Sequence, residues 1–194
     1  MSARSPAVVA GPGASRRYEV VLDERSLYCE LKIANVGREP FAPQCLLHTY
    51  LRVEDSKRVM VHGLENAKYV DKLAEDASKL VDEDMPAIMF QGETDRVYQG
   101  ASREPQPLTV RPEGYRVDAY GAVLDGDGAI EDELAADVVI WNPHVNKSKA
   151  MGDFDDDGWK AMCCVEPGVV AADRPVVAPG GALVLSQTLE ADGA

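Results

Sequence analysis

His48 stands in the middle of residues 44–53, where apolar side chains alternate with polar ones. Because side chains of a β-strand alternate between two faces, His48 would share its face with Tyr50 and Arg52. The pattern predicts one buried strand, and an imidazole, a phenol and a guanidinium on such a strand need polar partners or a ligand. Two interpretations stay open: a histidine held by structural hydrogen bonds, and one that contacts a ligand.

Two carboxylates are candidates to act with this histidine. Glu166 ends an apolar run and precedes a Pro-Gly pair, and Asp95 lies in a turn-like segment directly before Arg96. Each has a structural alternative: a cap or salt bridge for Glu166, and a local ion pair with arginine for Asp95. The sequence alone therefore nominates these carboxylates without deciding between chemistry and structure.

The spacing of the histidines and cysteines predicts no metal site. His62 and His144 have no metal-ligand spacing with His48, and the cysteines form no C-x-x-C pair. Residues 153–158 imitate the start of a calcium-binding loop, but Cys164 stands where that loop needs a bidentate glutamate. We expect no cofactor, and four free thiols in a reducing, cytoplasmic compartment.

The elements that must position these residues are short strands. Apolar runs separated by Gly-, Pro- and Asn-containing turns recur along the chain, with almost no helical periodicity. This predicts an all-β antiparallel sandwich in one domain at residues 18–194. Residues 73–84 are expected to form an exposed helix or loop. Residues 1–17, interrupted by prolines and glycines, are predicted to be a disordered tail.

Composition excludes several classes of partner. The 194-residue chain carries a formal net charge of -13, which repels nucleic acid phosphates and anionic lipid. No apolar run approaches the roughly 20 residues that a membrane-spanning helix needs. We therefore expect neither nucleic acid nor membrane as a partner.

A series of short motifs occurs in a recognisable order. The motifs are Leu47-His48-Thr49-Tyr50, Tyr69-Val70-Asp71-Lys72, Gly92-Glu93-Thr94-Asp95-Arg96, Val139-Ile140-Trp141-Asn142-Pro143, Cys164-Val165-Glu166-Pro167-Gly168 and Ser186-Gln187-Thr188-Leu189. In this order they resemble the glucose-6-phosphate 1-epimerase branch of the aldose 1-epimerase family, from about residue 18 to residue 189.

The resemblance implies a galactose-mutarotase-like β-supersandwich that interconverts the α and β anomers of an aldose 6-phosphate without a cofactor. By position in the motifs, His48 would be the general acid, Glu166 the general base and Asp95 a residue that binds a sugar hydroxyl. Mutarotation needs the anomeric hydroxyl proton removed while the ring oxygen gains one, and one acid and one base suffice.

The sequence departs from the family before residue 18. Members carry an N-terminal region there that supplies the first strands and residues that hold the sugar phosphate, so the sandwich is expected to be N-terminally truncated. Arg52, on the same predicted face as His48, is a substitute for binding the hexose 6-phosphate. Three alternatives stay open: an active epimerase, a catalytically impaired sugar-phosphate-binding remnant, and a chain whose start is incomplete. Exposed sheet edges also predict self-association.

Overall fold

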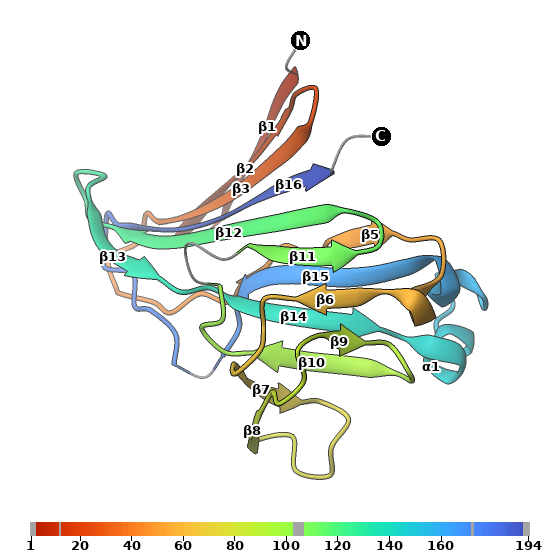
Figure 1. Ribbon diagram of the computed structural model, residues 1–194. Helices are drawn as coiled ribbons and strands as arrows, with labels where there is room; N and C mark the ends of the chain where they lie inside the picture. Colours follow the sequence, from red (N-terminus) through yellow and green to blue (C-terminus); the bar gives the residue numbers. More distant parts are fainter. Residues whose placement is uncertain (1–2, 12, 103–106, 172, 192–194) are drawn as a thin grey trace.

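The computed structural model describes residues 3–11, 13–102, 107–171 and 173–191, and arranges them as two β-sheets in which every described strand pairing is antiparallel (Figure 1). The nine-stranded sheet has the order β1 (Ala3–Gly11), β2 (Ala14–Leu22), β3 (Ser26–Asn35), β16 (Ala182–Ala191), β12 (Tyr115–Leu124), β11 (Leu108–Arg111), β6 (Met60–His62) and β9 (Ile88–Met89), with β13 (Ile130–Leu134) beside β12. The seven-stranded sheet has the order β4 (Cys45–Leu46), β15 (Met162–Val169), β14 (Asp137–Asn142), β10 (Thr94–Tyr98), β7 (Lys68–Asp71) and β8 (Leu80–Asp82), and β5 (Tyr50–Arg52) also pairs with β15. The predicted antiparallel all-β fold is confirmed.

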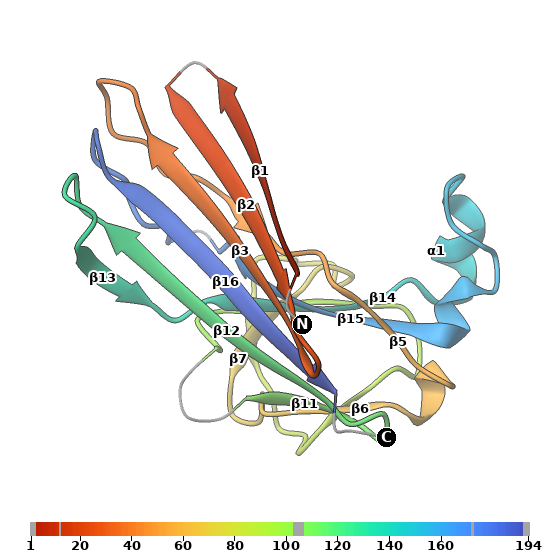
Figure 2. The same cartoon turned by 90° about the horizontal axis from the view of Figure 1, so that it is seen from above.

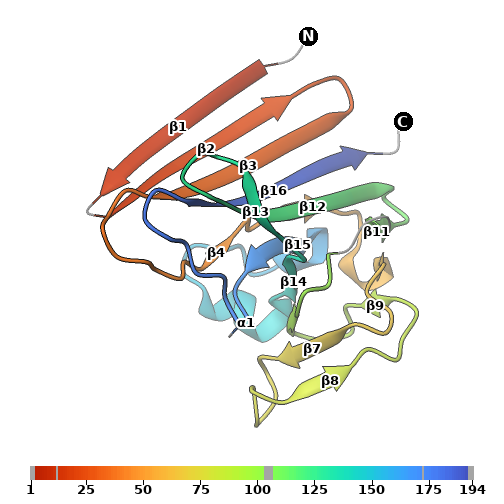
Figure 3. The ribbon, with the colours of Figure 1, turned by 90° about the vertical axis from the view of Figure 1, so that its left-hand side faces the viewer.

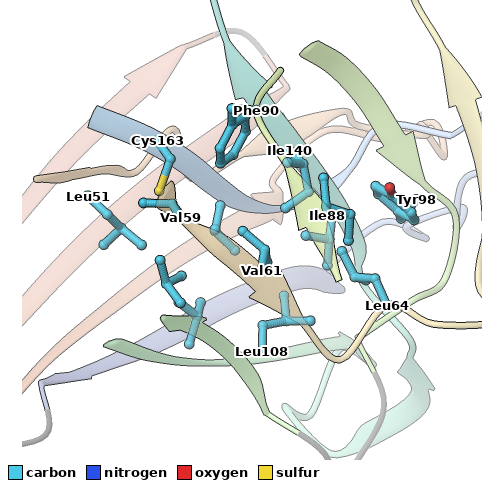
Figure 4. Packing of buried hydrophobic residues seen from close by; sticks show 14 of the residues in the cluster. Leu51, Val59, Val61, Leu64, Ile88, Phe90, Tyr98, Leu108, Ile140 and Cys163 are labelled. Atoms are coloured by element: carbon cyan, nitrogen blue, oxygen red, sulfur yellow. The ribbon is translucent and has the colours of Figure 1, made fainter. Parts of the chain in front are cut away.

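The largest group of buried apolar side chains lies between the two sheets (Figure 4). Val61 and Leu108 come from the nine-stranded sheet, and Leu51, Ile140 and Cys163 come from the seven-stranded sheet. Because alternate residues of a strand face opposite sides, this packing fixes which residues of β5, β14 and β15 face away from the core.

The first two strands correct a prediction. Residues 1–17 were expected to be a disordered tail, but β1 and β2 form a hairpin at the edge of the nine-stranded sheet, seen at the outer side of Figure 3. Gly13, with φ of 76°, supplies the left-handed turn residue, and an edge strand tolerates the missing N–H of Pro6. The predicted domain start at residue 18 thus falls inside β2; residues 1–2 and 12 lie outside the described part.

The segment around His48 is also corrected. Residues 44–53 were predicted to be one buried strand, but they form β4 and β5 with a break at residues 47–49. The Leu47 N–H donates to the Pro167 carbonyl over 2.9 Å, but proline has no N–H to return. The Leu47 carbonyl instead accepts from the Thr49 hydroxyl. The alternation itself holds: Leu47 and Leu51 are buried, while the His48 face is exposed.

Few residues form helices. The α-helix of the described part is α1 (His144–Ala150), and two 3₁₀ turns, η1 (Ser56–Arg58) and η2 (Gly158–Ala161), accompany it. Figure 2 shows α1 beyond the ends of β14 and β15. Residues 73–84 are turns and β8, rather than a helix. No helix in the described part of the chain is long and apolar enough to cross a membrane.

Candidate active site

Strand register brings His48 and Glu166 together. Strand β15 pairs with both halves of the broken segment, Cys164 opposite Tyr50 and Gly168 opposite Leu46. The same register carried across the break places Glu166 opposite His48, where side chains of a cross-strand pair meet. The Nδ1 atom of His48 lies 3.1 Å from Oε1 of Glu166. Two residues 118 positions apart in the sequence therefore form one acid–base pair.

The pair lies on the face of the seven-stranded sheet that points away from the core. Cys163 and Val165 belong to the core between the sheets, so Cys164 and Glu166 point the other way. The side chain of His48 is 49% exposed, whereas that of Glu166 is 2% exposed. A ligand on this face would therefore meet the imidazole in a solvent-accessible position, with the carboxylate shielded behind it.

Aromatic side chains fix the orientation of the imidazole. The His48 and Tyr50 rings stack with centroids 4.8 Å apart, and the Trp141 ring meets His48 edge-on at 5.8 Å. Phe154, from the loop after α1, packs edge-on against Trp141 at 6.5 Å. Stacked and edge-to-face contacts of this kind each contribute about 0.5–1.5 kcal/mol beyond area burial. The three aromatic residues also give the site an apolar wall.

Burial sets the proton affinities of the pair. It raises the pKa of the Glu166 carboxyl from 4.5 to about 8; the nearby charge of Asp95 adds to the rise, and a hydrogen bond with Cys164 opposes it. Burial also lowers the pKa of the His48 imidazolium below its ordinary 6.5. Both shifts disfavour the charged forms. Near neutral pH, the pair therefore holds one proton, which resides on the Glu166 carboxyl while the His48 imidazole is neutral.

Asp95 is on the same face of the sheet. It lies opposite Trp141, which in turn lies opposite Cys164, so Asp95 belongs to the row next to that of Glu166. Burial raises the pKa of Asp95, while the charges of Lys72 and Lys147 lower it. Asp95, a predicted site residue, thus lies two strands from β15, and the charges of Lys72 and Lys147 act on it.

Arg52 stands apart from the pair. It is exposed, lies opposite Met162 and follows His48 by four residues, roughly 13 Å along an extended chain. The alternation of the segment keeps Arg52 on the His48 face. The structure therefore brings His48, Glu166 and Asp95 into one region and leaves Arg52 at its margin.

Sequence reasoning overlooked one member of the site. The Sγ atom of Cys164 lies 4.0 Å from Nδ1 of His48, and Cys164 is buried beside Glu166. Burial, with the neighbouring Glu166 charge, raises the pKa of its thiol. The expectation of free thiols is confirmed for all four cysteines. Their spacing held no hint that one of them would face the acid–base pair; the alternation of β15, read together with Glu166, could have shown it.

Comparison with known proteins places this chain in a family. A family model described as aldose 1-epimerase matches residues 14–190. Two curated relatives, both named "Putative glucose-6-phosphate 1-epimerase", are 33% identical over 160 residues in Cenchrus ciliaris and 30% identical over 148 residues in Escherichia coli K12. They align with 80% and 76% of this chain but only 43% and 45% of their own lengths. The chain thus spans less than half the length of these relatives.

Solved structures agree at the level of the fold. A "putative mutarotase (YeaD)" from Salmonella typhimurium superposes with a TM-score of 0.72 at 23% identity, over 98% of this chain and 60% of that one. A galactose mutarotase related enzyme from Lactobacillus acidophilus gives a TM-score of 0.63 at 12% identity, over 99% of this chain and 68% of that one. The fold is therefore galactose-mutarotase-like, and with its family match over residues 14–190 the chain belongs to the aldose 1-epimerase family.

Proposed function

We propose that this protein interconverts the α and β anomers of an aldose 6-phosphate, with Glu166 as general base and His48 as general acid. The contact of 3.1 Å between these two side chains on a ligand-accessible face carries the proposal. Family membership supports the class of reaction. The names of the curated relatives support glucose 6-phosphate as the substrate.

The close spacing of the pair suits a hemiacetal carbon. The anomeric hydroxyl and the ring oxygen are bonded to the same carbon, so groups that lie side by side can reach both. Glu166 removes the hydroxyl proton and His48 gives a proton to the ring oxygen, which breaks the ring C–O bond and leaves an aldehyde. Rotation about the C1–C2 bond and reclosure with the proton transfers reversed give the other anomer.

The proton affinities suit these roles. A general base works best with a pKa near the working pH, and the rise of the Glu166 pKa to about 8 makes its carboxylate more basic. The lowered pKa of His48 makes its imidazolium a stronger acid. The reactive form, with the proton on His48, has the same proton count as the resting pair, so only a transfer within the pair is needed.

Binding of the sugar phosphate is assigned to the surrounding polar groups. Asp95 accepts hydrogen bonds from sugar hydroxyls, and the phosphate is directed to basic side chains at the margin, with Arg52 as the first candidate. Lys147, whose charge acts on Asp95, is a second. A sugar phosphate substrate and four free cysteines support the cytoplasm as the place of action.

The decisive experiment measures anomer exchange of glucose 6-phosphate at equilibrium by NMR. The wild type is expected to accelerate exchange above the buffer rate. Glu166→Gln is expected to lose about 10²–10⁴-fold, the usual contribution of one positioned proton transfer. Glu131→Gln, on exposed β13, is the matched control with the same change of charge. The proposal would be refuted if the anomer exchange rate were the same in the presence of the wild type, in the presence of Glu166→Gln and in buffer alone.

The alternative is a site that binds hexose phosphates without turnover. It predicts that glucose 6-phosphate raises the melting temperature while the exchange rate stays at the buffer value. Arg52→Ala tests the assignment of the phosphate to Arg52. It should weaken the binding of glucose 6-phosphate, seen as a smaller rise in melting temperature, and leave the rise with unphosphorylated glucose unchanged.

A further inference from the structure

Three different metal-ligating groups meet at the acid–base pair. Nδ1 of His48, Sγ of Cys164 and a carboxylate oxygen of Glu166 all lie within 4.8 Å of one another. Two of the separations are 3.1 Å, between His48 and Glu166, and 4.0 Å, between His48 and Cys164. Spacing along the chain predicted no metal site, because these three residues come together only where the break between β4 and β5 lies beside β15.

One of these groups lacks a hydrogen bond. Oε1 of Glu166 is buried and has no hydrogen-bond partner of good geometry among the described residues, although it lies 3.1 Å from the His48 ring. The side chain that carries it is only 2% exposed. A buried carboxylate oxygen without a donor is costly, and it usually marks a place that a proton, a water or an ion occupies. This oxygen lies 3.1 Å from Nδ1 of His48, which in turn lies 4.0 Å from Sγ of Cys164.

The spacing suits a small tetrahedral ion. Zinc binds nitrogen at about 2.0–2.1 Å and sulfur at about 2.3 Å, so its ligands stand roughly 3.3–3.6 Å apart. The separations of 3.1 and 4.0 Å fall on either side of that range and the third is within 4.8 Å, so binding would require small rotations that draw the three ligand atoms together. Three protein ligands leave a fourth position open, on the side where His48 reaches solvent.

We propose that His48, Cys164 and Glu166 form a reversible site for a zinc-class divalent ion. A thiolate and an imidazole select Zn²⁺ or Co²⁺ over Mg²⁺ and Ca²⁺, which prefer ligand sets made of oxygen. Binding displaces protons: the Cys164 thiol and the Glu166 carboxyl each release one to solvent, so the affinity rises with pH. The bound ion occupies the lone pairs that acid–base chemistry uses and therefore inhibits anomer exchange; this last consequence alone rests on the proposed function.

Cobalt is the probe that tests the site directly. The chelator-treated 194-residue protein is titrated with Co²⁺, and one equivalent should give a sulfur-to-cobalt charge-transfer band and the visible bands of four-coordinate cobalt. Zn²⁺ should remove both sets of bands and Mg²⁺ should not. Cys164→Ala should abolish the charge-transfer band, while Cys163→Ala, the adjacent cysteine on the opposite face, should keep it.

Two further measurements keep the test decisive if a cysteine variant fails to fold. Glu166→Gln keeps the size of the side chain and should lower the affinity for Co²⁺ by more than about 100-fold. The loss of a residue that only hydrogen-bonds a ligand would lower the affinity by less than this. In the wild type, the anomer exchange rate should fall as Zn²⁺ is added, and it should be halved at the Zn²⁺ concentration whose binding strength agrees with the Co²⁺ competition experiment. Absence of the charge-transfer band from the wild type, or its persistence in folded Cys164→Ala, would overturn the site. A band in a protein without anomer exchange would support the site and reject only the proposed function.

Discussion

Replacing Glu166 by glutamine should make the folded protein more stable above neutral pH, even though it removes the proposed catalytic base. Glu166 is almost fully buried, and burial raises the pKa of its carboxyl from 4.5 to about 8. Above pH 4.5 the unfolded chain releases this proton, whereas the folded protein keeps it until about pH 8. The folded state thus binds more protons in this window, and the free energy of unfolding falls as the pH rises through it.

The size of the effect follows from the same two values. Each pKa unit corresponds to about 1.36 kcal/mol, so the difference between 4.5 and about 8 gives roughly 5 kcal/mol over the whole titration. The contribution is fully present below pH 4.5 and is lost by about pH 8. His48 does not offset the loss, because burial lowers its pKa and leaves the imidazole neutral at the alkaline end. Glutamine keeps the size of the side chain and has no proton to lose.

Urea unfolding of the wild type and Glu166→Gln at about pH 5 and about pH 8.5, with EDTA present, measures this difference. The stability of the variant relative to the wild type should increase by about 4 kcal/mol between the two conditions. Glu131→Gln, on the exposed strand β13, should show no such increase. If the difference in stability between Glu166→Gln and the wild type changed by less than about 0.5 kcal/mol between the two pH values, the Glu166 carboxyl would not be held protonated by burial.

Four other outcomes are expected. With EDTA present, the anomer exchange rate should have a bell-shaped dependence on pH, because the active pair holds one proton. The rate should rise below pH 6.5 as His48 titrates and fall near pH 8 as Glu166 loses its proton. A rate that does not change with pH would exclude a one-proton active pair. Asp137→Ala should cost about 3 kcal/mol in urea unfolding, since Asp137 accepts three backbone N–H groups at 2.7–2.9 Å, while exposed Asp132→Ala should cost little. Arg96→Met should cost about 3 kcal/mol because it leaves buried Glu83, 3.1 Å away, with the Tyr98 hydroxyl but without its guanidinium partner, and adding Glu83→Gln should recover part of that loss. Sedimentation should show self-association through the edge of β1, and a monodisperse monomer at high concentration would contradict it.

Much of the strand pattern could be predicted because alternation is a local property. Cys29 and Ile33 in β3, and Leu51 in β5, are buried as their spacing predicts. The break in residues 44–53 could not be predicted, because its cause is the missing N–H of Pro167 on a neighbouring strand far along the chain. A local pattern carries no information about the partner that pairs with it.

Other errors have related causes. The first hairpin was missed because prolines and glycines normally disfavour strands, whereas an edge position and a turn accommodate them. Strand β13 was missed because its exposed acidic side chains resemble a loop; its pairing with β12 makes it a strand. Helix α1 has only seven residues and offers too little periodicity to detect.

The candidate active site also depends on strand pairing that a local sequence pattern does not show. Family resemblance nominated His48 and Glu166, but only the register of β15 shows that they are cross-strand neighbours. That register also turns Cys164 toward them, which makes a third ligand atom available where a simple acid–base pair was expected.

One physical condition, the burial of Glu166, connects the proposals. Shielding the carboxylate from water raises its basicity, which suits proton removal from a sugar. The same shielding makes the folded state less stable once the proton leaves, and it leaves an oxygen without a donor, which an ion can bind beside His48 and Cys164. A proton, a sugar hydroxyl and a zinc-class ion therefore compete for one oxygen atom. Glu166→Gln could change the exchange rate and leave both the pH dependence of stability and the affinity for cobalt unaltered. The carboxylate would then have to be exposed to water, and burial could not be the cause of its basicity.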